Sequence, residues 1–140
     1  MLNIVCSGKK SKGWLEAGLS DYEKRLRKPF DVRWTFTDDV ENTVSKLRKP
    51  RDFLIVLDER GKILSSPEIS QLLDRQFTFG NQVIIAIGGP YGFSDEFRNN
   101  SDFLWSFSKL VFPHELMRLY LIEQLYRAQE IRSGSKYHHE

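Results

Sequence analysis

The sequence lacks the features that mark several large classes of protein. It contains a single cysteine, Cys6, so no disulfide can form within the chain. No apolar run approaches the ~20 residues that a membrane-spanning helix needs, and the apolar start of MLNIVCSGKKSK is too short for a signal peptide. No Cys and His residues have the spacing of a zinc site. We therefore expect a cytoplasmic protein with a buried thiol and without a bound metal.

The common nucleotide-binding fingerprints GxGxxG and GK[ST] are also missing. The stretch 82–93, QVIIAIGGPYGF, stands out instead. Its apolar run, rich in β-branched residues, predicts a strand covered on both faces, as in a parallel sheet. The glycine pair after the run allows positive φ and close approach of a ligand to the main chain, and Ser94-Asp95-Glu96 predicts a helix start. Open α/β sheets bind ligands at such a turn, although a tight connection that binds nothing fits equally well.

Length and composition indicate one domain, residues 1–140, with 40% hydrophobic and 29% charged residues. The net charge of +2 is unevenly distributed. Residues 1–51 carry twelve Lys or Arg and seven Asp or Glu, whereas residues 52–140 carry nine and twelve. A basic face of this kind permits contact with a polyanion such as RNA. Solvated helix faces are the simpler explanation of the charge alone.

The hydrophobic pattern predicts strands that alternate with helices. It predicts a turn around Arg60-Gly61-Lys62, and a helix that starts at Ser66-Pro67-Glu68 with a cap followed by proline. Such alternation is typical of an α/β fold with a mainly parallel sheet flanked by helices. On this pattern alone, a flavodoxin-like nucleotide-binding domain is the first interpretation. The expected strands are 2–6, 32–36, 53–57, 83–87 and 103–106, and the expected helices are 12–27, 40–47, 66–77, a short one from about 95, and 113–132.

The last of these helices is apolar around more than half of its surface, which is too broad for a single core-facing stripe. One face can pack on the sheet, and the second face needs another partner. Because most soluble oligomers are two-fold homodimers, we expect the same helix of a second copy there. Burial within a single domain is the alternative. The chain then ends in YHHE, and two imidazoles in four residues indicate a possible site, although polar tails are usually disordered.

Three further segments are distinctive when taken together: IVLDERGK, IIAIGGPYGFS, and LWSFSKLVFPHELMRLYLIEQLYRA with the terminal YHHE. Together they resemble the ribosomal RNA large subunit methyltransferase H family, within the SPOUT class. The resemblance covers essentially the whole chain, and the order of the IGGP turn, the S-x-L-x-x-P-H segment and the YH-x-E terminus makes it specific. The chain departs from the family in two places. Its connection Asp38–Asp52 is shorter than in familiar members, and His139 stands where many members have arginine.

The resemblance implies a C-terminal trefoil knot in which three strand-end loops hold S-adenosylmethionine. Leu57 would end a buried strand and flank the adenine, and Gly89 would allow close approach of the main chain. The loop 108–113 would offer backbone donors and acceptors, although read alone it is an ordinary entry to a helix. Carried over by position, the cofactor contacts fall on Leu57, Gly89, Ser108, Lys109, Leu110, Val111, Phe112 and Pro113.

The resemblance also implies the reaction, which is methyl transfer to N3 of a pseudouridine in large-subunit (23S) ribosomal RNA. His138 is the expected proton acceptor, because imidazole exchanges protons near neutral pH. Tyr137 would orient the base, and Arg127 would stabilise negative charge or bind phosphate. If the tail closes the partner's pocket, as the family suggests, activity requires the dimer.

Two other functions remain open at this point. One is a SPOUT methyltransferase that acts on a different RNA, such as transfer RNA. The other is a non-catalytic ribosome-binding module that keeps the fold. An ordinary exposed position explains Arg127 equally well, and a fraying chain end explains Tyr137.

Overall fold

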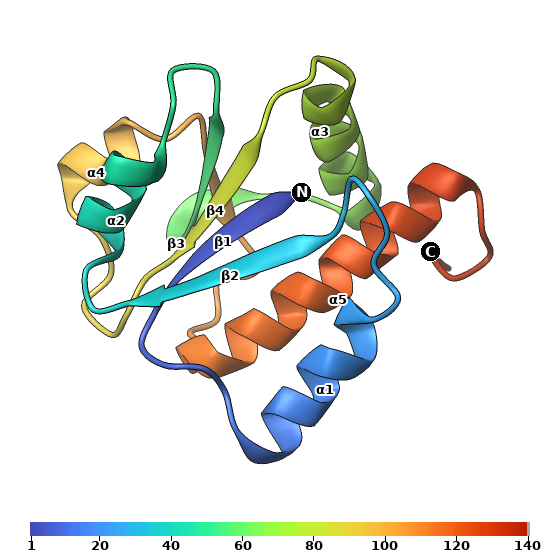
Figure 1. Cartoon of the computed structure of the whole chain (residues 1–140), viewed down its shortest axis with the longest axis horizontal. Helices are drawn as coiled ribbons and strands as arrows, with labels where there is room; N and C mark the ends of the chain where they lie inside the picture. Colours follow the sequence, from blue (N-terminus) through green and yellow to red (C-terminus); the bar gives the residue numbers. More distant parts are fainter. Residues whose placement is uncertain (140) are drawn as a thin grey trace.

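The computed structural model of the chain describes residues 1–139. Five strands form one sheet in the order β2-β1-β4-β3-β5 (Figure 1), and every neighbouring pair is parallel. The α/β fold with a parallel sheet, expected from the alternating pattern, is therefore confirmed. The strands are β1 (Leu2–Ser7), β2 (Val32–Thr37), β3 (Phe53–Ile63), β4 (Val83–Ile87) and β5 (Phe103–Ser106).

Helices cover both faces of the sheet (Figure 1). α1, α3 and α5 pack on one face and α2 and α4 on the other. The longest, α5, lies along α1 and α3 and ends in a Schellman-type left-handed residue, Gly134, with φ 77°. The helices are α1 (Gly13–Glu23), α2 (Val40–Leu47), α3 (Ser66–Thr78), α4 (Asp95–Asn99) and α5 (His114–Ser133).

The central strand β4 shows why its sequence is a continuous apolar run. Val83, Ile85 and Ile87 enter the core beneath α1, α3 and α5, whereas Ile84 and Ala86 enter the core beneath α2 and α4. Each of the five is at most 1% exposed. Burying a Val or Ile side chain contributes about 1.5–3 kcal/mol relative to exposure. A strand buried on both faces therefore has no polar positions with which to alternate.

The start of α3 corrects one expected detail. The cap is Ser65 and not Ser66: the Ser65 hydroxyl accepts from the Glu68 N–H, and the Glu68 carboxylate accepts from the Ser65 N–H at 2.9 Å. This is a capping box, which satisfies two helix-end donors. Pro67 then occupies the second helical position, where an amide hydrogen is not needed by the helix.

The expected turn around Arg60-Gly61-Lys62 is wrong, because β3 continues to Ile63. Its pairing with β5 shifts register between Leu57 and Lys62, so the intervening residues bulge out of the ladder. A Cβ on Gly61 would lie 2.6 Å from the main-chain carbonyl of Leu104 on β5. Glycine is therefore required there for close approach of two strands, and not for a reverse turn.

Cys6 is buried in β1, as expected, and burial raises the pKa of its thiol. No helix of residues 1–139 is long and apolar enough to cross a membrane. In the same part of the chain, no three His, Cys, Asp or Glu side chains are grouped so that they could hold a metal ion.

Candidate functional site

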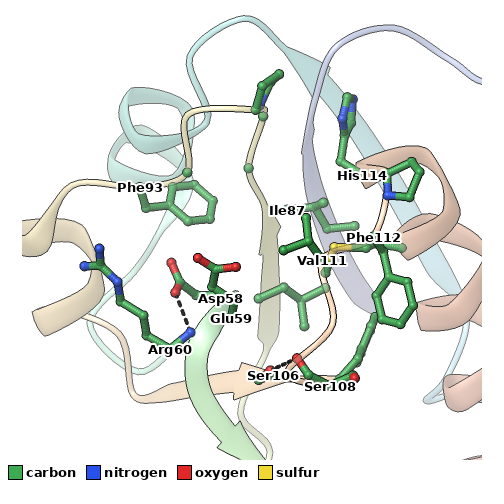
Figure 2. Close-up of a pocket in the computed structure, with 18 of the residues that line it drawn as sticks. Asp58, Glu59, Arg60, Ile87, Phe93, Ser106, Ser108, Val111, Phe112 and His114 are labelled. Atoms are coloured by element: carbon green, nitrogen blue, oxygen red, sulfur yellow. Dashed lines mark hydrogen bonds between the residues drawn. The ribbon is translucent and has the colours of Figure 1, made fainter.

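A cleft of about 500 Å³ opens at the bulge of β3, where its ladder is interrupted after Leu57, and at the ends of β4 and β5. His114, in the first turn of α5, borders the cleft (Figure 2), and Met117 of the same helix also lines it. The carboxyl ends of parallel strands are where open α/β sheets bind ligands. The volume lies within the range of small-molecule sites, roughly 300–1,000 Å³.

The cleft brings together most of the residues expected to contact the cofactor. Three segments supply these residues: the bulge of β3, the turn after β4 and the loop after β5. The three segments are far apart in sequence. Lys109 belongs to the third segment but is not among the residues that line the cleft. The expected residues that line it are Leu57, Gly89, Ser108, Leu110, Val111, Phe112 and Pro113.

The glycine turn after β4 has a packing role that its sequence did not reveal. Neither Gly88 nor Gly89 takes a positive φ, which occurs instead at Gly92 (69°). A Cβ on Gly89 would lie 2.9 Å from the Ser7 hydroxyl, and one on Gly88 would lie 3.0 Å from the Phe93 ring. The two glycines therefore let the turn pack against β1 and against Phe93, which lines the cleft.

The loop after β5 is held by its own serines. The Ser106 hydroxyl donates to the Ser108 carbonyl at 2.9 Å, and the Ser108 hydroxyl accepts from the Leu110 N–H at 3.0 Å. Leu110 and Val111 remain 69% and 83% exposed. The loop is thus fixed by polar contacts while it presents apolar side chains outward, where a ligand or another chain can cover them.

A buried ion pair forms the opposite wall of the cleft. The Arg98 Nε donates to the Asp58 carboxylate at 2.7 Å, and Arg98 also contacts Asp95 at 2.8 Å. Asp58 also accepts from the Arg60 N–H at 2.9 Å. The hydrogen bond to Asp58 raises the pKa of the Arg98 guanidinium. These contacts fix the bulge of β3 against α4.

Sequence reasoning did not include this wall among the site residues. Asp58 directly follows the buried run of β3, which was the one available signal. Its partner Arg98 lies 40 residues away, and no spacing rule pairs the two. Other lining residues that were not expected are Glu59, Arg60, Ile87, Phe93, His114 and Met117.

The three expected catalytic residues also come together, around Glu123 on α5. The Arg127 guanidinium binds the Glu123 carboxylate at 2.6 Å and contacts the His138 Nδ1 at 3.0 Å. The Tyr137 hydroxyl donates to Glu123 at 3.3 Å, and Arg127 lies 4.9 Å from the centre of the Tyr137 ring. We call Glu123, Arg127, Tyr137 and His138 the tail cluster. Glu140, the last residue of YHHE, lies outside the described residues.

Charge and burial shift two pKa values in the tail cluster. The Glu123 carboxylate raises the pKa of Arg127. Burial, the Tyr22 hydroxyl and the Glu123 charge raise the pKa of Tyr137 to about 12. Arg127 is therefore a cation and Tyr137 a neutral hydrogen-bond donor at neutral pH.

The cleft and the tail cluster lie at different positions along α5. His114 and Met117 border the cleft, whereas Glu123 and Arg127 follow Met117 by six and ten residues. At ~1.5 Å rise per residue, these separations are roughly 9 and 15 Å along the helix axis. The structure thus assembles each expected set of residues but does not join the two sets within one chain.

Known proteins resemble this chain over its whole length. The family described as predicted SPOUT methyltransferase matches residues 1–138. Ribosomal RNA large subunit methyltransferase H of Coprothermobacter proteolyticus is 38% identical over 98% of both chains, and the protein of the same name from Desulfitobacterium hafniense is 36% identical with the same coverage.

The fold also matches a solved structure, that of a probable methylase family protein from Haemophilus influenzae. The TM-score is 0.62 at 10% identity, and the match covers 99% of this chain and 70% of the other. At this identity the likeness supports the fold alone. The full-length matches in sequence show that the chain belongs to the SPOUT methyltransferase family, and within it to the ribosomal RNA large subunit methyltransferase H family.

Proposed function

We propose that this protein uses S-adenosylmethionine to methylate N3 of a pseudouridine in large-subunit ribosomal RNA, and that it acts in the cytoplasm. The observation that carries the proposal is the cleft at the bulge of β3 and the ends of β4 and β5, lined by seven of the eight residues expected to contact the cofactor. The names of the relatives, whose alignments cover 98% of this chain, support large-subunit ribosomal RNA as the substrate.

The residues of the cleft fit S-adenosylmethionine. Leu57, Ile87 and Met117 offer apolar surface for an adenine ring, and the loop 108–113 offers main-chain polar groups for its edge. The Glu59 carboxylate, also in the lining, suits a ligand that carries a sulfonium and an ammonium group. When bound, the cofactor supplies an electrophilic methyl group on an already activated leaving group.

We further propose that the active protein is a homodimer in which α5 of one copy runs antiparallel to α5 of the other. The tail cluster of one copy would then lie at the cleft of its partner, since none of its residues lines the cleft of its own chain. Three exposed apolar side chains support such an interface: Leu110 and Val111 in the loop before α5, and Tyr120 on α5 itself. The C-terminal trefoil knot implied by the family resemblance is part of the same proposal.

The contact between Arg127 and His138 suggests how the tail cluster would act on the base. A guanidinium has only donors, so the His138 Nδ1 must accept from Arg127. In the neutral ring the proton then resides on Nε2, which is buried and has no partner among the described residues. We therefore propose that RNA binding shifts the tail so that Nε2 is uncovered, donates to a carbonyl oxygen of the base and stabilises the anion formed when N3 loses its proton to water. This differs from the proton-acceptor role expected for His138.

The test is transfer of labelled methyl from S-adenosylmethionine to ribosomes, followed by mapping of the modified nucleotide. Ribosomes that lack the pseudouridine serve as the control. Label at N3 of one large-subunit pseudouridine is the expected result. Label on transfer RNA, or at an unmodified uridine, would contradict the proposed substrate. Saturable cofactor binding without any transfer to RNA would favour a non-catalytic ribosome-binding module.

A further inference from the structure

Exposed basic side chains and an exposed indole occupy the loop between β1 and α1. Lys9, Lys10 and Lys12 are exposed, and Trp14 in the first turn of α1 is 70% exposed. We call these four side chains the Lys9–Trp14 surface. A large exposed aromatic residue among cations is typical of an interaction site, because tryptophan is otherwise mostly buried.

A buried arginine holds this loop in place. Arg118 of α5 is 1% exposed, and its guanidinium donates to the Lys9 carbonyl and the Ser11 hydroxyl at 2.8 Å and to the Ser7 carbonyl at 2.9 Å. Its Nε has no partner among the described residues, and no carboxylate of residues 1–139 forms an ion pair with it. Burying a guanidinium without a carboxylate partner is unfavourable. The fold therefore accepts an energetic penalty at Arg118 to fix the geometry of this loop.

The same arginine places the loop beside the cleft. Arg118 follows Met117, which lines the cleft, and the Ser7 hydroxyl lies 2.9 Å from the position of a Cβ on Gly89. Figure 1 shows the β1–α1 connection passing the first turn of α5. A polymer that enters the cleft from the side of the β1–α1 loop would therefore contact the Lys9–Trp14 surface.

The lysines of this surface are less neutralised than the other basic groups near α5. Within residues 1–139, Lys9 and Lys12 form no ion pair, and Lys10 approaches Glu16 only at 3.9 Å. By contrast, three of the four basic residues in the segment 24–28 are paired with carboxylates: Lys24 and Arg25 with Asp21, and Arg27 with Glu130. Free ammonium groups bind phosphates, and an exposed indole stacks on unpaired bases.

We propose that the Lys9–Trp14 surface binds the ribosomal RNA segment next to the target nucleotide, with the lysines on phosphates and Trp14 stacked on an unpaired base. This inference depends on the proposed RNA substrate. It assigns to the surface a role in RNA affinity that is separate from cofactor binding in the cleft and from the tail cluster.

The test is co-sedimentation of the full-length protein with ribosomes over a range of KCl concentrations. We expect the triple substitution K9Q/K10Q/K12Q to make the slope of log Kobs against log[salt] shallower by about 2–3, since each phosphate contact contributes roughly 0.7–0.9. We expect Trp14→Ala to weaken binding roughly 5- to 150-fold at every salt concentration without changing the slope, and Trp14→Phe to retain most of the affinity.

The matched control is K46Q/K49Q/R51Q, which removes three exposed positive charges near the start of β3, at the opposite edge of the sheet from the cleft. It should change the slope by less than about 1. Cofactor binding should be unchanged in all variants, which would show that the cleft remains folded.

Three results would overturn the inference. The first is a K9Q/K10Q/K12Q variant with the same slope as the control, and the second is a Trp14→Ala variant that binds as tightly as the wild type. The third is a Trp14→Ala variant that sediments as a monomer when the wild type is a dimer, which would place Trp14 in the subunit interface. Failure of the wild-type protein itself to bind ribosomes would instead overturn the proposed substrate.

Discussion

The cleft and the tail cluster are built by different means. The cleft is formed by the bulge of β3, by the ends of β4 and β5, and by main chain that packs closely on neighbouring residues, as Gly89 does on Ser7. The tail cluster consists of side chains gathered around one ion pair on a single helix, Glu123–Arg127 at 2.6 Å. Its outer members, Tyr137 and His138, follow the end of α5 and have no core of their own.

This difference separates binding from chemistry. A site made by strand ends is as rigid as the sheet, which suits recognition of a fixed small molecule. A site held by a few hydrogen bonds can be lost without unfolding the domain. Changes in the tail cluster should therefore affect methyl transfer and leave cofactor binding intact, and changes in the cleft should do the reverse.

Removal of the tail should have the largest effect. Deleting residues 137–140 takes away the Tyr137 and His138 contacts with Glu123 and Arg127. We expect methyl transfer to fall by at least about 10³-fold, because positioning and charge stabilisation are lost together. Cofactor affinity by calorimetry and the dimer mass by light scattering should stay the same. A truncated protein with full activity would exclude any catalytic role of the tail.

Substitution of His138 should have the next largest effect and should separate its two possible roles. If Nε2 donates to a base carbonyl, His138→Ala should lower kcat by about 10²-fold, as for loss of one oxyanion donor. The kcat of His138→Gln should be about tenfold higher than that of His138→Ala. The pH dependence of kcat should keep its shape in His138→Gln. If both variants are equally inactive, and the pH dependence of the residual kcat changes shape, His138 is a general base instead.

Substitution of Gly89 should affect the cleft and spare the chemistry. Gly89→Ala places a Cβ 2.9 Å from the Ser7 hydroxyl, so we expect the cofactor Kd to rise roughly tenfold, in the range of overpacking effects. Ser7→Ala removes that hydroxyl, and the double variant should recover most of the affinity. At saturating cofactor, kcat should be close to that of the wild type. Loss of kcat without loss of affinity would show that the two regions are coupled.

The smallest expected effect is on the pH dependence of tail docking. The pKa of Tyr137 is raised to about 12, first by burial, from an ordinary value of 10.0. A raised folded-state pKa means that this contribution to docking is complete below about pH 10 and is lost as the pH rises through about 12. Titration of tyrosinate absorbance should show one late-titrating tyrosine, absent in Tyr137→Phe. If the wild type shows no late transition, and Tyr137→Phe only reduces the transition near pH 10, Tyr137 is exposed.

Local sequence predicted most of the fold because each element carries its own signal. The run 83–87 gave a doubly buried strand, and the Ser94 cap placed the start of α4 at Asp95. The helix 40–47 and the strand 103–106 have the bounds that the pattern predicted. Where the prediction failed, a long-range contact decided the outcome: Gly61 resembles a turn residue in the sequence, but the backbone of β5 packs against it and β3 continues.

The site could be predicted only in part, for the same reason. The resemblance to a family supplied Leu57, Gly89 and the loop after β5, which the structure places around one cleft. It did not supply the wall made by Asp58 and Arg98, nor the buried Arg118 that holds the β1–α1 loop. These pairs are far apart in sequence, so neither composition nor periodicity connects them.

The sequence by itself determined the class of this protein: an α/β domain with a parallel sheet, and its membership of a methyltransferase family. Hydrophobic periodicity, helix caps and short motifs are local features. They can therefore be recognised in any chain that carries the same pattern of residues. Only the tertiary structure decided that segments of three strands far apart in sequence form one cleft, that the Gly89 turn packs on Ser7, and that the tail cluster gathers around Glu123 and outside this cleft. Such facts depend on distances between segments, which are set when the sheet and helices pack and not before.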